Sequence, residues 1–407
     1  MFELNPNNIL PFGVDPSRAN LAIVSISENP AFFKIRNDQR SHRGFLNKVA
    51  KMASETGRYP VFAVEGNSPF AIGFEFEAYR RGYPVYEITP HRLSEMREVL
   101  CGEDQTDYRD AKTAALIITH IPQLLRPASL DLKQFALKRL VKIRLRLVKD
   151  QTRNINLLHN HLAQIWGPSY KDFFPVLNSS QALTFFAIFP TPGYLNLETE
   201  RILTYLADTG LAYYRSNWGK KRVGLIMDKV RGMNWRGDEY LSELGWEVGL
   251  LANDALKRRQ KIIEVNARLI EQGKGWEAER IELVRTIPGF DWVLACSAVV
   301  LIGDLSRFER SSDFIAYCGL VLCAKDSGNT RRVKRRKRRN KMLSYVFYQA
   351  ALASLHSSEL SQRYYQKKLS EGKDSKQALR ALAKKLAEIT YAVLKNKEPY
   401  DEKRHLN

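Results

Sequence analysis

The chain has 407 residues, of which 44% are hydrophobic and 11% aromatic, a composition typical of globular domains rather than of disordered segments. Its formal net charge of +20 favours a polyanionic partner, with nucleic acid ahead of an acidic membrane surface. The sequence has no apolar run long enough to cross a bilayer, no secretory pattern before Pro11 and no CxxC pair, so we expect a cytoplasmic protein with reduced cysteines and no structural zinc site.

The first 120 residues alternate between strand-like and helical patterns. Strand patterns cover Ile9–Val14, Leu21–Ile26, Ala31–Ile35, Tyr59–Val64 and Tyr83–Ile88. Helical spacing covers His42–Thr56, Pro69–Arg81, Pro90–Leu100 and Thr106–His120. A turn signal at residues 27–30 joins the second and third strands into a hairpin. Three strands followed by alternating helices and strands predict a mixed sheet flanked by helices.

A long helix follows, because residues 129–166 contain no helix breaker. Its apolar residues recur at heptad spacing in two rows, the second interrupted by Arg144 and Gln151. The first row is Val141, Val148, Ile155 and Leu162, and the second is Leu137, Leu158 and Ile165. This pattern predicts a coiled-coil-like seam, whose partner helix belongs to the same chain or to a second subunit. The exposed cations form either a solvated face or a nucleic-acid contact; they are Lys138, Arg139, Lys142, Arg146 and Lys149.

The rest of the chain is mainly helical. Residues 168–245 contain turn signals and short helical pieces to which we assign no function, and Gly245–Gln272 is a second long helix that can return alongside the first. Further helical segments are Trp276–Arg285, Leu294–Ile302, Ser311–Tyr317, Met342–Ser354 and Lys376–Leu394. The turn at Pro288-Gly289 is either a helix–helix corner or a set of backbone N–H groups for a phosphate.

A Ser-Gly turn at Ser327 is followed at once by a cationic run. Nine of the eleven residues from 331 to 341 are basic: Arg331, Arg332, Lys334, Arg335, Arg336, Lys337, Arg338, Arg339 and Lys341. A protein core cannot hold these charges together without an anionic partner. The serine hydroxyl is therefore either a nucleophile aimed at a phosphodiester or an incidental group in a solvated basic loop.

Four carboxylates form a second candidate site. Asp15 and Glu65 follow two of the predicted strands, and Asp107 and Asp110 lie at i and i+3 on one helical face. If that helix packs over the strand ends, all four can meet at Mg²⁺, the usual ion of phosphoryl chemistry on DNA. Individually, each has an ordinary alternative, a turn residue for Asp15 or a helix cap for Asp107.

The order of these motifs resembles that of the IS110-family transposases, DEDD recombinases related to the Piv DNA invertases. The matching segments are Gly13-Val14-Asp15-Pro16-Ser17-Arg18, Val64-Glu65-Gly66, Thr106-Asp107-Tyr108-Arg109-Asp110-Ala111, Thr286-Ile287-Pro288-Gly289, Tyr317-Cys318-Gly319-Leu320 and Asp326-Ser327-Gly328. The resemblance covers nearly the whole chain.

The resemblance implies an α/β plus all-α fold in three parts. These are an RNase H-like, RuvC-type domain at residues 1–125, a coiled-coil region at 126–280 and a helical transposase domain at 281–407. It implies that Asp15, Glu65, Asp107 and Asp110 bind Mg²⁺ and that Ser327 forms a covalent phosphoserine link with cleaved DNA. It also implies target and donor DNA as substrates, a bridge-type guide RNA, a dimer or tetramer, and action at the nucleoid of a prokaryotic cell.

The leading hypothesis is a transposase that cuts and rejoins DNA through Ser327. The alternatives are a RuvC-like nuclease or junction resolvase that only hydrolyses DNA, and a non-enzymatic nucleic-acid-binding protein. Other residues that suggest chemistry have structural explanations. His159 and His161 lie in the heptad helix, Tyr345 and Tyr348 have the spacing of packing residues, and Ser311 and Ser312 have the pattern of a helix N-cap.

Overall fold

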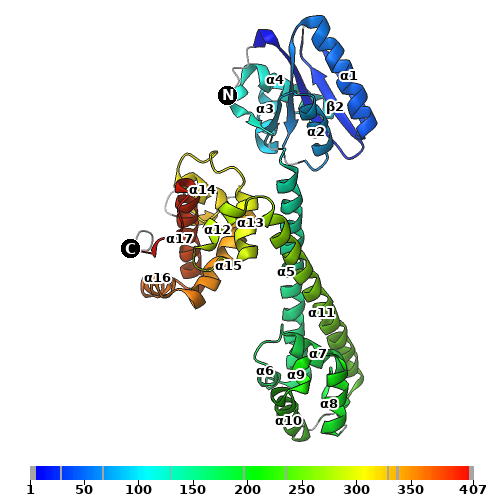
Figure 1. Cartoon of the computed structure of the whole chain (residues 1–407), viewed down its shortest axis with the longest axis vertical. Helices are drawn as coiled ribbons and strands as arrows, with labels where there is room; N and C mark the ends of the chain where they lie inside the picture. Colours follow the sequence, from blue (N-terminus) through cyan, green and yellow to red (C-terminus); the bar gives the residue numbers. More distant parts are fainter. Residues whose placement is uncertain are drawn as a thin grey trace. The chain divides into compact units, whose positions relative to one another are not determined.

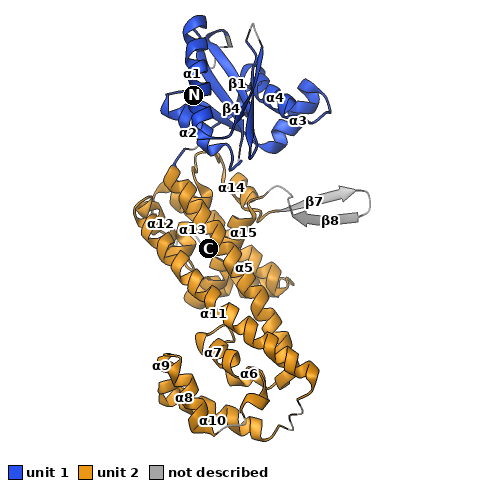
Figure 2. Ribbon diagram, turned by 90° about the vertical axis from the view of Figure 1, so that its right-hand side faces the viewer, with its two compact units in different colours: residues 1–131 blue, residues 132–407 orange. Residues whose placement is uncertain are grey.

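The computed structural model describes residues 6–27, 30–66, 68–128, 130–195, 198–233, 235, 237–327, 330–335 and 339–402, with the backbone alone for residues 6, 322–327 and 330–335 (Figure 1). The chain divides into two compact units, Met1–Asp131 and Leu132–Asn407 (Figure 2). The division into three domains at residues 125 and 280 stays a prediction. No helix in the described ranges combines the length and the apolar character that a membrane crossing needs.

The first unit is a mixed sheet with helices on both faces. Its strands are β1 (Ile9–Pro16), β2 (Asn20–Ser25), β3 (Ala31–Arg36), β4 (Tyr59–Glu65), β5 (Val85–Ile88) and β6 (Arg126–Pro127), and its helices are α1 (Gln39–Thr56), α2 (Ile72–Arg80), α3 (Pro90–Cys101) and α4 (Asp107–His120). The strand order is β3-β2-β1-β4-β5-β6, in which β1, β4 and β5 run parallel and the other pairings are antiparallel. The predicted α/β unit is confirmed; β6 was not predicted.

Strand alternation decides what each face of this sheet carries. In β1, Leu10, Phe12 and Val14 pack under α1 and α2, so the intervening residues face α3 and α4. On that second face Gly13 is followed by Asp15, and on β4 the buried Ala63 is followed by Glu65. Each strand therefore carries a carboxylate near its C-terminal end, on the face against which α4 packs. Figure 2 shows α4 beside β1 and β4.

The second unit is built on two long antiparallel helices, α5 (Leu132–Trp166) and α11 (Glu239–Lys274). At 1.5 Å per residue each is roughly 50 Å long. Arg144 Nε donates to Asn266 Oδ1 at 2.8 Å, and Asn154 Nδ2 donates to the Leu251 carbonyl at 2.9 Å. Because these partners run in opposite directions along the two helices, the partner of the predicted seam is supplied by the same chain.

A helical bundle packs on each end of this helix pair. One surrounds the C-terminal end of α5 and consists of α6 (Tyr170–Phe173), α7 (Ser180–Ile188), α8 (Thr199–Asp208), α9 (Ala212–Arg215) and α10 (Asn217–Arg231). The other packs on the N-terminal end of α5 and consists of α12 (Ala278–Arg285), α13 (Trp292–Ile302), α14 (Ser311–Cys318), α15 (Lys341–Ser357), α16 (Glu359–Ser370) and α17 (Ser375–Asn396). The stretch 168–245, unassigned from sequence, is thus a bundle with its own core.

The basic run, the serines before α14 and the Pro-Gly turn all lie in this unit. The basic run is not a plain loop, because β7 (Leu322–Ser327) and β8 (Thr330–Arg335) pair as an antiparallel ribbon. Ser311 and Ser312 do not cap α14: the cap position is Arg310, and the serines begin the helix. The Pro-Gly turn is a packed corner, because Gly289 has φ +87° and a side chain there would collide with Ala350 and Ser354 of α15.

The two histidines of the heptad helix connect it to its neighbours. His161 lies 3.3 Å from the Glu247 carboxylate of α11, and His159 Nδ1 is 2.8 Å from the Tyr170 hydroxyl of α6. Both contacts agree with the structural explanation of these residues. Tyr348 packs against the C-terminal core, whereas Tyr345 lines a cavity beside Arg144.

Candidate active site

Asp15 and Glu65 lie beside each other because their strands are parallel neighbours. In the β1–β4 pairing Val14 is opposite Val64, which places the next residues, Asp15 and Glu65, at the same edge and on the same face of the sheet. Carboxyl ends of adjacent parallel strands are the usual position for functional groups in such sheets. The register thus brings together two carboxylates that are 50 positions apart in the sequence.

The other two carboxylates reach this edge on α4. Thr106 caps the helix by accepting a hydrogen bond from the Arg109 amide at 3.2 Å, so Asp107 is in the first turn rather than at the cap. Asp110 is one turn further along. The helix lies close to β1 because Gly13 has no side chain: an added methyl group would collide with backbone atoms of Ala111 and Ala115. Gly13 therefore allows α4 to deliver its carboxylates to the strand ends.

The four carboxylates line one cavity of about 340 Å³. Its other polar walls come from α3 and from the segment before α4: Ser94, Arg97, Gln105 and Thr106. All four acidic residues predicted from the sequence are therefore brought together by the fold. The cavity lies wholly within the first unit.

Arg97 of α3 is the member of this site that sequence reasoning missed. Its Nη1 donates to Asp110 Oδ1 at 2.7 Å and its Nη2 donates to Ser94 Oγ at 3.3 Å, while its buried Nε bonds no group in the described part of the chain. The residue is only 7% exposed. The sequence does indicate that Arg97 is buried. Arg97 lies four residues after Leu93 and three before Leu100, which places it on the apolar side of α3. A buried arginine needs an anionic partner.

The electrostatics of the cavity show an excess of negative charge. Burial, and then the charges of Asp110, Glu65 and Asp107, raise the pKa of Asp15 from 3.8 to about 7. Burial and the charge of Asp110 also raise the pKa of Glu65, although Arg97 opposes the rise. One arginine therefore does not balance four carboxylates, and a further cation would relieve their repulsion.

The donor set suits Mg²⁺, which binds carboxylate oxygens. As the side chains stand, however, no three His, Cys, Asp or Glu groups within the described ranges converge on one ion position. Arg97 occupies one oxygen of Asp110. An ion held through Asp110 Oδ2 leaves this hydrogen bond in place, so Arg97 and a metal can share the carboxylate.

Comparison with known proteins connects this site to one family. Residues 12–167 match the IS110-type DEDD family model, described as "Transposase", and residues 281–366 match the model "Transposase IS116/IS110/IS902 family". An uncharacterized protein of insertion element IS116 from Streptomyces clavuligerus is 26% identical over 78% of this chain and 77% of its own length. The chain belongs to the IS110 family of transposases.

Other relatives of this IS110-family transposase are named for DNA rearrangement. The transposase of insertion sequence IS1111A from Coxiella burnetii is 33% identical over 30% of this chain and 35% of its own length. The pilin gene-inverting protein of Moraxella lacunata is 28% identical over 31% of this chain and 40% of its own length. The chain is thus a DNA transposase or recombinase, and its matched DEDD domain implies an RNase H-like fold, with which the strand order agrees.

The second predicted site of this transposase lies on the β7–β8 ribbon. The backbone of Ser327 ends β7 and pairs with Thr330 of β8. The Ser327 side chain lies outside the described part of the chain, as do those of Arg331, Arg332, Lys334, Arg335, Arg336, Lys337 and Arg338. Of the remaining cations in the run, Arg339 packs over Gly319 and Lys341 is exposed at the start of α15.

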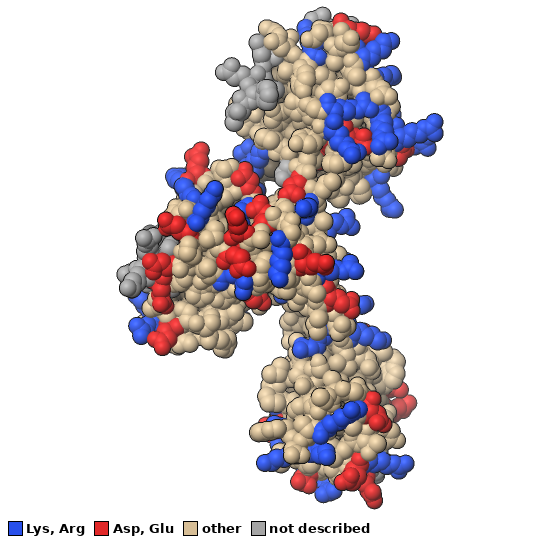
Figure 3. All heavy atoms as spheres, in the orientation of Figure 1, with Lys and Arg blue, Asp and Glu red and all other residues tan. Residues whose placement is uncertain are grey.

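The long helix α5 of this transposase carries an ordered stripe of positive charge. Its members are exposed and follow one another at intervals of three and four residues: Arg139, Lys142, Arg146, Lys149 and Arg153. That spacing places them on one side of the helix. Figure 3 shows Lys and Arg side chains, interspersed with acidic ones, along the long helix pair. Lys138 differs, since it is half-buried and donates to Gln134 Oε1 at 3.2 Å. The exposed cations of α5 are therefore aligned along one side of the helix rather than scattered around it.

The raised pKa of Asp15 predicts a stability gain for Asp15→Asn. The folded chain holds this proton up to about pH 7, whereas a carboxyl with the pKa of 3.8 releases it earlier, so the folded state loses stability as the pH rises between these values. Asparagine does not titrate. We expect Asp15→Asn, in EDTA, to unfold with a free energy higher by on the order of 2 kcal/mol above pH 7, a figure reduced for solvent screening.

Urea unfolding at pH 5 and pH 8 measures this difference for the transition of the first unit. The difference in unfolding free energy between variant and wild type should be larger at pH 8 than at pH 5. It should decrease when Mg²⁺ is added, because the ion neutralises the carboxylates. Equal pH dependence in the two proteins would contradict the electrostatic account of the cavity.

Proposed function

We propose that this transposase cuts and rejoins DNA with a two-part active site, made of the acidic cavity and the hydroxyl of Ser327. The observation that supports the proposal is that Asp15, Glu65, Asp107 and Asp110, from two parallel strands and one helix, line one cavity. A purely structural role does not account for four carboxylates in one cavity with one compensating arginine, because their repulsion is unfavourable. Unfavourable repulsion between buried charges, with raised pKa values, is typical of functional sites.

The four carboxylates are the residues that would hold Mg²⁺ in an RNase H-like, RuvC-type domain. A bound Mg²⁺ supplies a Lewis acid that stabilises negative charge on the oxygens of a reacting phosphate. The fold supplies rigidity: β1 and β4 fix Asp15 and Glu65, and the capped first turn of α4 fixes Asp107 and Asp110. Arg97 holds Asp110 in place and limits the repulsion among the carboxylates.

Ser327 would act as the nucleophile. A bond forms between its Oγ and the phosphorus of one phosphodiester, the bond from that phosphorus to one deoxyribose oxygen breaks, and the leaving oxygen takes up a proton. The serine proton goes to a carboxylate, with Asp107 and Asp110 as the candidates. The phosphoserine link retains the phosphoester bond, so that a DNA hydroxyl can reverse the step and rejoin strands without ATP.

The partners of this reaction follow from the family resemblance and from charge. We expect target and donor DNA, a bridge-type guide RNA, and a dimer or tetramer in which the acidic cavity of one subunit acts with Ser327 of another. The α5–α11 pair would be the coiled-coil spacer, with its basic stripe along a nucleic-acid backbone. The reaction would take place in the cytoplasm, at the nucleoid.

A hydrolytic nuclease is the second candidate, and one observation favours it. The acidic cavity is complete without Ser327, since all four carboxylates come from the first unit. Water activated at such a site can cleave DNA directly. The two candidates differ in their products: hydrolysis leaves free ends, whereas serine attack leaves DNA attached to protein.

The proposal is tested with the purified full chain and the RNA that copurifies with it. End-labelled DNA carrying the element's termini is incubated with Mg²⁺ and resolved on a denaturing gel with and without protease. We expect a protein-linked product that disappears in EDTA or after ribonuclease treatment, and sequencing of the copurified RNA should show segments complementary to both DNA substrates. Cleavage that persists in EDTA would refute the metal site, and cleavage that persists after ribonuclease treatment would refute the guide.

A further inference from the structure

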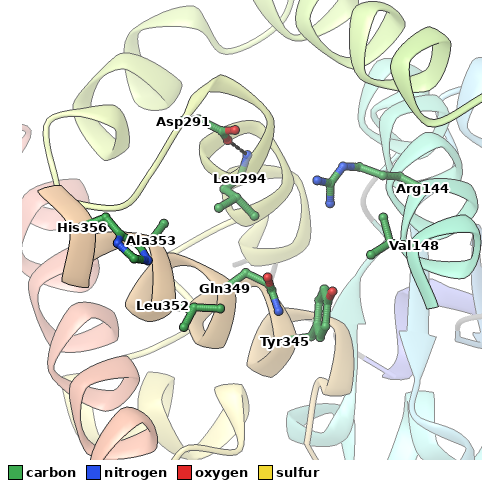
Figure 4. A pocket seen from close by; sticks show the side chains of 9 residues that line it. All are labelled: Arg144, Val148, Asp291, Leu294, Tyr345, Gln349, Leu352, Ala353 and His356. Carbon is green, nitrogen blue, oxygen red and sulfur yellow. Dashed lines mark hydrogen bonds between the residues drawn. The ribbon is translucent and has the colours of Figure 1, made fainter. Parts of the chain in front are cut away.

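A second polar cavity lies in the other unit, between α5, α13 and α15 (Figure 4). It has a volume of about 290 Å³. Arg144 reaches in from α5, Asp291 lies across from it at the start of α13, and Tyr345 and Gln349 project from α15. None of these residues belongs to the acidic cavity or to the β7–β8 ribbon, so neither part of the proposed active site uses them.

The polar groups of this cavity have unused hydrogen-bonding capacity. Arg144 Nε donates to Asn266 Oδ1, and among the described residues no group accepts a hydrogen bond from its two Nη atoms. Asp291 Oδ1 accepts the Leu294 amide at 2.7 Å and caps α13, which leaves Oδ2. Tyr345 and Gln349 make no side-chain hydrogen bond to any described residue. Donors and acceptors are therefore both available to a ligand.

The arrangement of charge narrows the class of ligand. Arg144 and Asp291 attract each other, but no ion pair joins them within the described ranges. Each can therefore bind a ligand group that lies between them. A phosphate would suit Arg144 but would be repelled by Asp291. Aliphatic walls from Val148 and Leu294, with the aromatic ring of Tyr345, suit a planar and partly apolar molecule instead.

Guanine matches both charged groups at once. Its O6 and N7 are adjacent acceptors, which a guanidinium binds with two parallel hydrogen bonds. Its N1–H and N2–H groups are adjacent donors on another edge, which a carboxylate can accept. Adenine and cytosine offer single amino groups and lack this combination. We propose that the cavity between α5, α13 and α15 binds one unpaired guanine of a single-stranded segment of nucleic acid.

The neighbouring surface favours a strand over a free nucleotide. A further cavity of about 300 Å³ adjoins the first, since both are lined by Val148, and it continues between α5 and α11. Its walls include Asn266, the partner of Arg144, and Arg259. A flanking nucleotide has a place there. The inference requires that the chain bind nucleic acid, and it does not require the cutting chemistry.

The test measures base preference with the full chain in EDTA, which prevents cleavage. The probes are fluorescent oligothymidines of 12 nucleotides with guanine, adenine, inosine or 7-deazaguanine at one central position, and the readout is the dissociation constant from anisotropy. We expect guanine to bind about tenfold more tightly than adenine, the discrimination of one good bidentate contact. Inosine lacks the amino group that faces Asp291, and 7-deazaguanine lacks N7, so both should bind with intermediate affinity.

Two variants connect the preference to the cavity. Asp291→Asn keeps the α13 cap, since asparagine caps equally well, but removes the charge; Arg144→Lys keeps the charge but loses the forked donors. Each should abolish most of the guanine preference, while the matched change Asp254→Asn, on the exposed side of α11, should leave it intact. Ala353→Phe adds bulk from an exposed position on the cavity rim and should lower guanine affinity to that of adenine.

Oligouridine probes with the same central bases distinguish RNA from DNA as the source of the guanine. A preference in either series supports the site and names its strand. Equal affinity for all four bases in both series would overturn the proposal. So would a guanine preference that survives Arg144→Lys, Asp291→Asn and Ala353→Phe.

Discussion

Asp15→Asn is expected to abolish DNA cleavage, lowering the single-turnover rate with Mg²⁺ by about 1,000-fold or more. The variant keeps the size of the side chain but removes one of the four charges that would hold the ion. Asp15 stands at the carboxyl end of β1, beside Glu65 and against the first turn of α4. Asp110→Asn should have an effect of the same order, because both residues line the same cavity.

The assay separates chemistry from binding. DNA affinity, measured in EDTA, should stay within about twofold of the wild type or improve slightly, because a negative charge facing the substrate is removed. Glu75→Gln is the matched control. Glu75 is also a buried carboxyl whose pKa is raised, to about 8, by burial and by Glu87, but it lies on α2 outside the cavity. Cleavage by Asp15→Asn within tenfold of the wild type would contradict the metal site.

Asp15→Asn thus has two opposite consequences. It removes the proposed activity, and above pH 7 it stabilises the fold by relieving the repulsion that raises the pKa of Asp15. Residues selected for stability alone do not behave in this way, since their loss destabilises. Observing both effects in one variant would identify the cavity as a functional site more firmly than either effect alone.

The acidic cavity could be predicted from the sequence because its members follow local rules. Strand alternation and a strand end place Asp15 and Glu65, and the i, i+3 spacing places Asp107 and Asp110. The pattern does not predict that α4 lies close enough to β1 for the four carboxylates to meet. The close approach of α4 depends on Gly13, whose lack of a side chain lets Ala111 and Ala115 come within contact of β1. In the sequence, nothing around Gly13 indicates this close approach.

Arg97 and the packing of residues 168–245 into one bundle were not predicted, for different reasons, although helical pieces were expected in that stretch. The hydrogen-bond partner of Arg97 is Asp110, which lies on another helix. The periodicity of α3 indicates that Arg97 is buried, but it does not identify this partner. The bundle is made of short helices, two of them only four residues long, and its core is aromatic, with Trp166, Phe173 and Phe186 in mutual edge or stacked contact. Segments of one turn carry no helical period for a sequence pattern to detect.

The partner of the long seam was left open between the same chain and a second subunit. Both alternatives satisfy a heptad pattern, which specifies an apolar stripe but not its occupant. The structure assigns α11 of the same chain, through Arg144 with Asn266 and Asn154 with the Leu251 carbonyl. The two polar residues that interrupt the heptads also bond within the chain. Arg144 donates to Asn266 of α11, and Gln151 Nε2 donates to Asn178 Oδ1 at 2.7 Å, so neither needs a second subunit.

Ser327→Ala is expected to remove the protein-linked DNA product entirely, to below about 0.1% of the wild-type yield, because no other group would replace the attacking oxygen. The wild type and the variant are incubated with labelled DNA, Mg²⁺ and the copurified RNA, then denatured and resolved with and without protease. DNA binding should be unchanged, since the substitution removes one oxygen from the end of β7 and leaves every cation of the basic run in place.

Two control variants test whether the loss of the protein-linked product is specific to Ser327. Ser311→Ala and Ser312→Ala remove the rival serines, which begin α14 and have no role in the proposed reaction, so both should form the covalent product at the wild-type level. The form of any residual cleavage then decides between the two candidate functions. If Ser327→Ala still cuts DNA and leaves free ends, while Asp15→Asn does not cut, the acidic cavity works with water and the chain is a hydrolytic nuclease. If both variants lose all cleavage, hydroxyl and carboxylates act as one catalytic unit, as the proposed transposase mechanism requires.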